Sequence, residues 1–93
     1  MAIQSFACKD TQALFGGRRI PRWVRIESAA LRKLAILNRV TVLEELRIPP
    51  GNRLEALARD RAGQHSIRVN DQWRICFTWT RNGPAGVEIV DYH

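Results

Sequence analysis

The sequence predicts an α+β fold, a small and mostly antiparallel sheet with an N-terminal helical hairpin packed on one face. Between residues 22 and 40, apolar residues recur every three or four positions, as on one face of an amphipathic helix. From residue 65 onward they recur at every second position, as on strands with one apolar face. The chain has 93 residues, 45% of them hydrophobic, so we expect residues 1–93 to form a single domain with one core.

The first half of the chain contains the predicted helices. Ile3 to Phe6 is a candidate short strand, and Asp10 to Phe15 is a candidate short helix with Asp10 as its N-cap. The main helix is predicted from Arg22 to about Val40, with an apolar face made of Trp23, Ile26, Ala30, Leu34 and Leu37. Thr41 to Glu44 fits a capping box, which predicts a second, short helix that ends before Pro49. These two helices would form the hairpin.

The second half is predicted to form the sheet. Leu54 to Arg59 is a candidate strand, although its alternation is poor. Three further strands alternate apolar and polar residues, and they are His65 to Val69, Trp73 to Thr80, and Val87 to Val90. Turn residues separate them at positions 70–72 and 81–83, which favours two β-hairpins.

The charge indicates a nucleic-acid partner. Fifteen basic and nine acidic residues give a net charge of +6, and every basic residue except Lys9 and Lys33 is an arginine. Arginine suits bidentate phosphate contacts and stacking on bases. The alternative is a protein whose basic surface has no such partner. Arg25, Arg32 and Arg39 recur at every seventh position, away from the apolar face of the long helix and with Lys33 nearby.

Several classes of protein and site are not expected. No apolar run approaches the ~18 residues of a membrane span, and the N-terminus lacks the pattern of a secretory signal, so we expect a cytosolic protein. Cys8 and Cys76 form no metal-ligand motif, and the acidic residues do not cluster as magnesium ligands, so no metal and no cofactor is expected. Cys76 is expected to be a small, reduced packing residue.

Polar residues on the predicted sheet are candidates for a site. Arg68 and Arg74 lie on adjacent strands, away from the apolar positions, and are expected to share the face that the helices leave uncovered. They would either bind phosphate or be solvated beside acidic neighbours. The stiff loop from Pro49 to Arg53, with Glu55 behind it, either positions catalytic groups or simply connects a helix to a strand.

The C-terminal Asp91, Tyr92 and His93 have acid–base capacity, because histidine titrates near neutral pH. By strand parity, Asp91 and His93 join the core-facing positions and Tyr92 points the other way. Either the pair lies at the rim of the core, or a bulge or strand end re-aims it. The alternative is a polar tail without function.

Several segments together carry a family resemblance. Pro49 to Leu57, Ser66 to Phe77 and Val90 to His93, with Ile3 to Phe6 and Arg32 to Leu34, resemble the HigB toxins of the RelE-like superfamily of bacterial toxin–antitoxin systems. The resemblance spans nearly the whole chain. It implies one RelE/HigB-like toxin domain, a small sheet with helices on one face.

The resemblance also implies a function. Such toxins are small, basic, metal-independent endoribonucleases (mRNA interferases) that enter the ribosomal A site and cut the mRNA being translated. A helix-turn-helix antitoxin of the HigA type, encoded nearby, holds the toxin inactive and represses the operon. We therefore expect the bacterial ribosome, mRNA and this antitoxin as partners, DNA only through the antitoxin, and no membrane contact.

Cleavage by an internal 2′-hydroxyl needs a base, an acid for the leaving 5′-oxygen and cations for the phosphorane charge. By the resemblance, His93 and Asp91 match the acid–base positions, Tyr92 lies between them, and Arg74 matches the arginine that holds the phosphate. The resemblance and the charge together name further candidates for phosphate or RNA binding, and these are Arg53, Arg59, Arg68, Arg25, Arg32 and Arg39.

Two positions depart from part of the family. Glu55 stands where some members carry a histidine, and Ala58 stands where some carry a lysine. The second proton-transfer group is therefore open: Glu55 is a candidate base, while Arg53 and Arg59 are candidate sources of charge.

Two other functions remain to be compared with the nuclease. ParE-type toxins of the same superfamily act on DNA gyrase without cutting RNA, and a basic nucleic-acid-binding module would have no toxicity. The ending Asp91-Tyr92-His93 favours the nuclease, because a pure binding protein has no need of acid–base groups.

Overall fold

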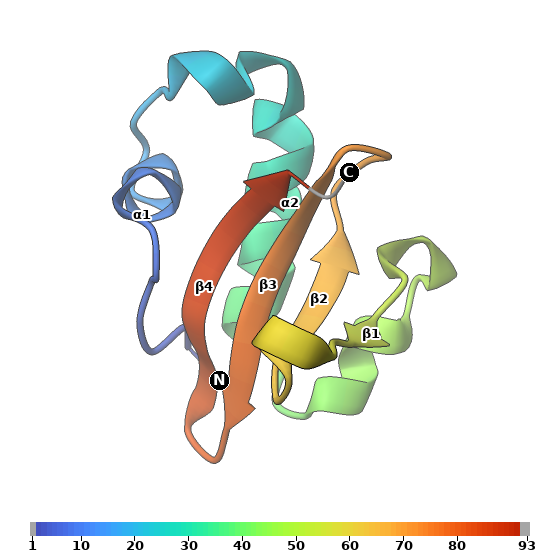
Figure 1. The fold of residues 1–93 in the computed structure, drawn as a ribbon. Helices are drawn as coiled ribbons and strands as arrows, with labels where there is room; N and C mark the ends of the chain where they lie inside the picture. Colours follow the sequence, from blue (N-terminus) through green and yellow to red (C-terminus); the bar gives the residue numbers. More distant parts are fainter. Residues whose placement is uncertain (1, 92–93) are drawn as a thin grey trace.

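The computed structural model describes residues 2–91. Within this range two α-helices, α1 (Lys9–Phe15) and α2 (Glu27–Arg39), precede the strands β1 (Glu55–Ala56), β2 (His65–Arg68), β3 (Trp73–Thr80) and β4 (Gly83–Asp91) (Figure 1). Short 3₁₀ segments lie in the connections, at Pro21–Ile26, Leu43–Arg47, Pro50–Asn52 and Arg59–Arg61. The predicted α+β class is confirmed.

The four strands form one antiparallel sheet in the order β1-β2-β3-β4. Along the outer edge of β4, the N-terminal segment pairs in parallel: the Val87 N–H donates to Ser5 O at 3.1 Å, and the Ala7 N–H donates to Val87 O at 3.0 Å. The candidate strand from Ile3 to Phe6 is therefore extended against the sheet but makes only an isolated bridge. This segment covers part of an edge that would otherwise present unpaired backbone groups.

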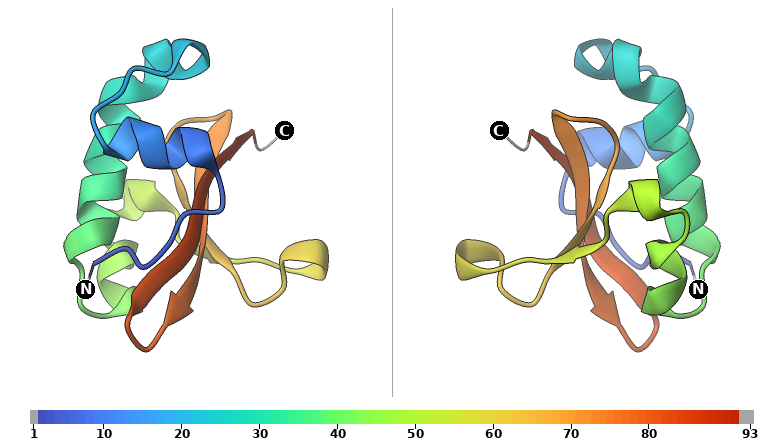
Figure 2. Two further views of the ribbon diagram at one scale, coloured as in Figure 1. Left: turned by 90° about the vertical axis from the view of Figure 1, so that its left-hand side faces the viewer. Right: turned by 90° about the vertical axis from the view of Figure 1, so that its right-hand side faces the viewer.

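Both α-helices lie on one side of the sheet, and the segment around residue 60 lies on the other (Figure 2). The predicted apolar parity is confirmed, because the core between sheet and helices is built from Ala30, Leu34 and Leu37 of α2 and from Ile67, Ile75, Phe77, Val87 and Ile89 of the strands. Burial of these side chains is the main favourable term in folding.

The predicted helix boundaries need two corrections. The helix expected from Arg22 is α-helical only over Glu27–Arg39, because Pro21–Ile26 is a 3₁₀ segment. Trp23 and Ile26 are both buried and three residues apart, a spacing that the three-residue turn of a 3₁₀ helix places on one side. The N-cap of α1 is Cys8, so Asp10 lies in the first turn, where the helix dipole favours a negative charge.

The helical hairpin is not confirmed, because a single 3₁₀ segment, Leu43–Arg47, takes the place of the second helix. It ends before Pro49, as predicted. Its capping carboxylate is that of Glu45 rather than Glu44: Glu45 Oε1 accepts the backbone N–H of Thr41 at 2.8 Å and of Val42 at 3.1 Å. These hydrogen bonds hold the pKa of Glu45 below its usual value.

The strand expected from Leu54 to Arg59 is reduced to Glu55–Ala56. Arg53 and Arg59, which flank it, have φ values of 46° and 56°. This left-handed backbone cannot continue a strand, so β1 ends on both sides where the chain turns.

None of the helices within residues 2–91 has the length and apolar character needed to cross a membrane.

Candidate active site

The sheet face turned away from the helices carries three of the predicted site residues, Glu55, Arg68 and Arg74. In the antiparallel register Arg68 lies opposite Arg74, and Glu55 of β1 lies opposite Ser66, which in turn faces Cys76. Side chains directly opposite one another on neighbouring strands are close enough to interact. The prediction that Arg68 and Arg74 share this face is therefore confirmed.

Arg74 is buried, with 7% of its surface exposed, and its guanidinium is held from three directions. Its Nε donates to Ser66 Oγ at 2.8 Å, its Nη2 donates to the Arg53 carbonyl at 2.6 Å, and its Nη1 lies 3.2 Å from Glu55 Oε1. The planar fork of arginine is thereby fixed in one orientation. The side chain of Glu55 is half-exposed and forms the outer part of the Arg74–Glu55 ion pair.

Two further arginines, Arg53 and Arg59, lie before and after Glu55 in the sequence. Arg53 and Arg59 are exposed residues on either side of β1, and both have left-handed backbones.

Arg68, half-buried on β2, pairs with Asp71 in the β2–β3 turn, and this ion pair holds the pKa of Asp71 below its usual value. The loop from Pro49 to Arg53 contacts one candidate site residue, because the Arg53 carbonyl accepts a hydrogen bond from Arg74.

Asp91 lies at the end of β4, opposite Trp73 in the register. Its parity is therefore that of the core side, as predicted, but the strand ends here and its side chain is exposed at the rim. Asp91 Oδ2 accepts a hydrogen bond from Gln72 Nε2 at 3.1 Å. Tyr92 and His93 lie outside the described residues, so their predicted roles remain proposals.

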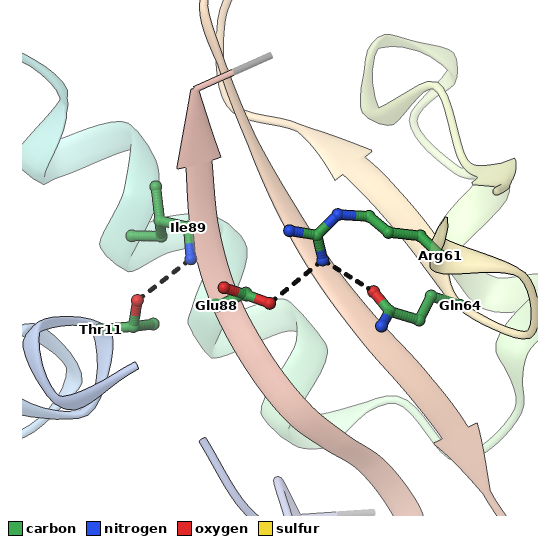
Figure 3. A network of polar contacts seen from close by, with 5 residues as sticks. All are labelled: Thr11, Arg61, Gln64, Glu88 and Ile89. Atoms are coloured by element: carbon green, nitrogen blue, oxygen red, sulfur yellow. Dashed lines mark hydrogen bonds and ion pairs between the residues drawn. The ribbon is translucent and has the colours of Figure 1, made fainter. Parts of the chain in front are cut away.

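A second polar network on the open face is shown in Figure 3. Arg61 reaches over β3 to β4, where its Nη1 lies 3.1 Å from Glu88 Oε2, and the same nitrogen donates to Gln64 Oε1 at 3.0 Å. This network holds the segment between β1 and β2 against the sheet. Cys76 is fully buried, which fits the packing role predicted for it. Burial also raises the pKa of its thiol. On the other edge of β4, the Ile89 N–H donates to Thr11 Oγ1 at 3.0 Å.

The sequence suggested that Lys33 lies with the exposed arginines of the long helix. In the structure it lies apart from them. It is 9% exposed, and its Nζ donates to Oδ1 of the fully buried Asn52. Burial lowers the pKa of Lys33, as do the nearby charges of Arg32 and Arg68. The sequence offered one signal for this contact: Lys33 directly precedes Leu34 of the apolar face, so it borders the buried stripe.

Arg25, Arg32 and Arg39 are exposed, as predicted for the face opposite the core. Arg25 belongs to the 3₁₀ segment and the other two to α2. Arg25 also lines an open pocket of about 400 Å³ between that segment and the β2–β3 turn, together with Arg22, Gln72 and Trp73. Gln72 connects this pocket to Asp91.

Among residues 2–91, no three His, Cys, Asp or Glu side chains gather as metal ligands would. The polar groups described above are cations, carboxylates, amides and hydroxyls of the chain. Such groups can hold a phosphate, stabilise negative charge and transfer protons.

The fold and this basic face define a class of protein. Residues 15–93 match the family of RelE-like toxins of type II toxin–antitoxin systems, and the chain belongs to that family. Within it the match is to HigB. The chain is also 52% identical over 68 residues to the protein named Toxin HigB-1 of Vibrio cholerae serotype O1, an alignment that covers 73% of this chain and 70% of the relative.

The protein is therefore a HigB toxin of a type II toxin–antitoxin system, and an antitoxin is its partner. These matches support the toxin predicted from the sequence rather than a gyrase-directed ParE-type toxin or a basic binding module.

Proposed function

We propose that this toxin is a metal-independent endoribonuclease that cuts mRNA on the translating bacterial ribosome and so inhibits translation in the cytoplasm. Its antitoxin would be of the helix-turn-helix HigA type, and contact with DNA would come only through that antitoxin. The observation that carries the proposal is the buried, triply anchored guanidinium of Arg74 on a basic sheet face. Membership of the HigB-like toxin family supports the proposal.

In the proposed reaction, the 2′-hydroxyl attacks the adjacent phosphorus and loses its proton to a base. The bond from phosphorus to the 5′-oxygen breaks, and an acid gives that oxygen a proton. The products are a 2′,3′-cyclic phosphate and a 5′-hydroxyl. Negative charge increases on the phosphoryl oxygens in the transition state, and donors fixed in advance stabilise it without reorganising.

Arg74 is proposed to supply this fixed charge. Its guanidinium is already desolvated and oriented by Ser66 and the Arg53 carbonyl, so little side-chain freedom is lost when phosphate binds. Arg53, Arg59 and Arg68 are proposed to hold the neighbouring phosphates. Glu55 lies 3.2 Å from Arg74 and is half-exposed, which makes its carboxylate a candidate for the base.

His93 and Asp91 are proposed as the acid–base pair, with Tyr92 beside them. The hydrogen bond from Gln72 supports Asp91, because it orients the carboxylate at the end of β4. The exposed Arg25, Arg32 and Arg39 are proposed to contact ribosomal RNA, away from the chemistry.

The decisive test is primer extension on a translated reporter mRNA after the toxin is induced without its antitoxin. The wild type should arrest growth and produce discrete cuts. His93→Ala should lose roughly 10²–10⁴-fold in cleavage rate, the usual contribution of general acid–base catalysis. A folded, ribosome-binding His93→Ala protein that cuts at the wild-type rate would remove His93 from the mechanism and leave Asp91, Tyr92 and Glu55 as candidates.

Absence of cleavage by the wild type, together with inhibition of DNA supercoiling, would overturn the nuclease proposal. We also expect cleavage to require translation, because one small domain has little surface with which to grip free mRNA. Efficient cutting of naked mRNA at the same sites would contradict that expectation.

A further inference from the structure

Five polar side chains are buried in the described part of the chain, those of Thr11, Lys33, Asn52, Ser66 and Arg74. Thr11 caps the β4 edge, whereas the other four form two adjoining contacts, Lys33 with Asn52 and Ser66 with Arg74. Buried polar groups cost free energy unless they are hydrogen-bonded, so a connected set of them calls for an explanation.

Asn52 is the centre of the first contact. Its Oδ1 accepts from Lys33 Nζ, and its Nδ2 donates to the carbonyls of Leu46 at 3.1 Å and Ile48 at 3.4 Å. Asn52 thereby ties α2 to the segment that leads into the 3₁₀ turn Pro50–Asn52. Asn52 has no exposed surface, and its contacts with Lys33 and the Leu46 carbonyl are buried.

Arg53 joins this contact to the site. It follows Asn52 directly, and its N–H donates to Pro50 O at 3.0 Å, which closes the turn. Its φ of 46° belongs to the left-handed region that ends such turns. The carbonyl oriented in this way accepts the 2.6 Å hydrogen bond from Arg74 Nη2. The chain of contacts therefore passes around the β1 edge of the sheet, from the helix side to the open face.

A purely structural role would not require a buried lysine at position 33. The described contacts of Lys33 include no ion pair with a carboxylate, and a buried cation is usually no more stabilising than an apolar side chain of similar volume. Buried polar networks are instead well suited to specify one geometry.

We propose that Lys33 and Asn52 are positioning residues for Arg74, fixing through the Arg53 carbonyl the orientation in which its guanidinium meets the scissile phosphate. The role in RNA cleavage rests on the function proposed above. The effect of Lys33 and Asn52 on the orientation of Arg74 does not rest on that function. The effect on orientation and the effect on cleavage can therefore be tested separately.

The direct test is hydrogen exchange of the Arg74 Nε–H group by ¹⁵N NMR, with the signal assigned from its loss in Arg74→Lys. In Lys33→Met the buried charge is removed, and methionine retains the unbranched apolar stem, so the fold should persist. Exchange of the Arg74 Nε–H should accelerate by about tenfold or more, because the turn at residues 50–53 opens more easily. Lys9→Met, which changes the exposed lysine of α1, is the matched control and should leave exchange unchanged.

The second test is single-turnover cleavage on programmed ribosomes. Lys33→Met should lower the cleavage rate at saturation by roughly 10- to 100-fold, as expected for a misplaced catalytic group, while the concentration for half-saturation stays constant. Asn52→Asp keeps an acceptor for Lys33 but places an oxygen against the carbonyls of Leu46 and Ile48. It should therefore shift the Arg74 signal and lower the rate in the same way.

Unchanged Arg74 exchange in both folded variants would overturn the proposal, whatever their activity. Faster exchange with an unchanged cleavage rate would overturn the positioning role in the reaction. If the wild type itself does not cut RNA, the proposed function fails, while the exchange experiment still decides whether Lys33 and Asn52 orient Arg74.

Discussion

On the side of the sheet that packs against α2, the buried strand residues are all apolar, among them Ile67, Ile75 and Phe77. On the opposite side the buried strand residues are Ser66, Arg74 and Cys76, and ion pairs to Glu55 and Glu88 lie around them. The first side obtains its stability from removing apolar surface from water. The second holds desolvated charges in fixed positions, which is useful for chemistry and adds little net stability.

This difference teaches that substitutions on the two sides should fail in different ways. Loss of a core side chain should reduce the free energy of unfolding and reduce activity only through unfolding. Loss of an open-face group should reduce the rate of the reaction in a protein that still folds. Four experiments, in order of decreasing expected effect, test this separation.

The largest effect is expected for Phe77→Ala on the helix side. Phe77 is fully buried, so truncation leaves a cavity and should lower the free energy of unfolding by about 3–5 kcal/mol. That is a large part of the stability of a domain of this size, typically about 5–15 kcal/mol. Urea titration measures the change, and Thr78→Ala, at the exposed neighbouring position of β3, should change little. A loss below about 1 kcal/mol would show that the core can collapse around the cavity.

Arg74→Ala is the open-face counterpart. It should reduce cleavage on the ribosome by roughly 10²–10³-fold, because a fixed donor to the developing charge is lost. Its cost in stability should be smaller than that of Phe77→Ala, and thermal unfolding compares the two. Arg81→Ala, at the exposed β3–β4 turn, is the matched control and should cut mRNA at the wild-type rate. If Arg74→Ala and Phe77→Ala lost equal amounts of cleavage rate and of unfolding free energy, the proposed distinction between the two sides would be wrong.

The exposed arginines of the helix layer test whether that side also binds RNA. Replacing Arg25, Arg32 and Arg39 together by Gln should weaken ribosome association and flatten its salt dependence, by roughly one unit of log–log slope per lost phosphate contact. The control variant replaces three other exposed cations by Gln, which changes the net charge by the same amount: Lys9, Arg47 and Arg81. Binding that is equal in both triple variants would mean that Arg25, Arg32 and Arg39 are only solvated.

The smallest effects concern two carboxylates whose folded pKa values lie below the usual range. Glu45 is stabilised by N–H and hydroxyl donors of Thr41 and Val42, and Asp71 by the guanidinium of Arg68. A lowered folded pKa contributes stability above the unfolded pKa, and this stability is lost as pH falls through the folded value. Both contributions should therefore be present at neutral pH and disappear in acid.

Salt should separate these two carboxylates. Added salt screens the exposed pair of Asp71 and Arg68 more than the hydrogen bonds to Glu45. NMR titration of both side chains should thus show the pKa of Asp71 rising towards its usual value in high salt while that of Glu45 stays low. Equal shifts would contradict this difference in cause between Asp71 and Glu45.

Much of this protein could be predicted from its residues. The period of two in Trp73 to Thr80 predicted β3 with its bounds, and the same period placed Arg68 and Arg74 on one face. The two-residue β1 and the 3₁₀ segment at Leu43–Arg47 could not be anticipated. Short elements have too few residues for a period to show, and their ends depend on neighbours distant in sequence.

The amino-acid pattern by itself determined the fold class, the apolar parity of the strands and the exposed arginines of the helix layer, because burial and periodicity are local properties of the chain. Only the tertiary structure decided that Arg74 is enclosed by Ser66, Arg53 and Glu55, and that Lys33 is buried against Asn52. Whether a charged side chain lies in water or in the interior depends on which distant segments cover it and offer it hydrogen-bond partners. Those contacts form when the segment from Asn52 to Glu55 folds against both α2 and β3.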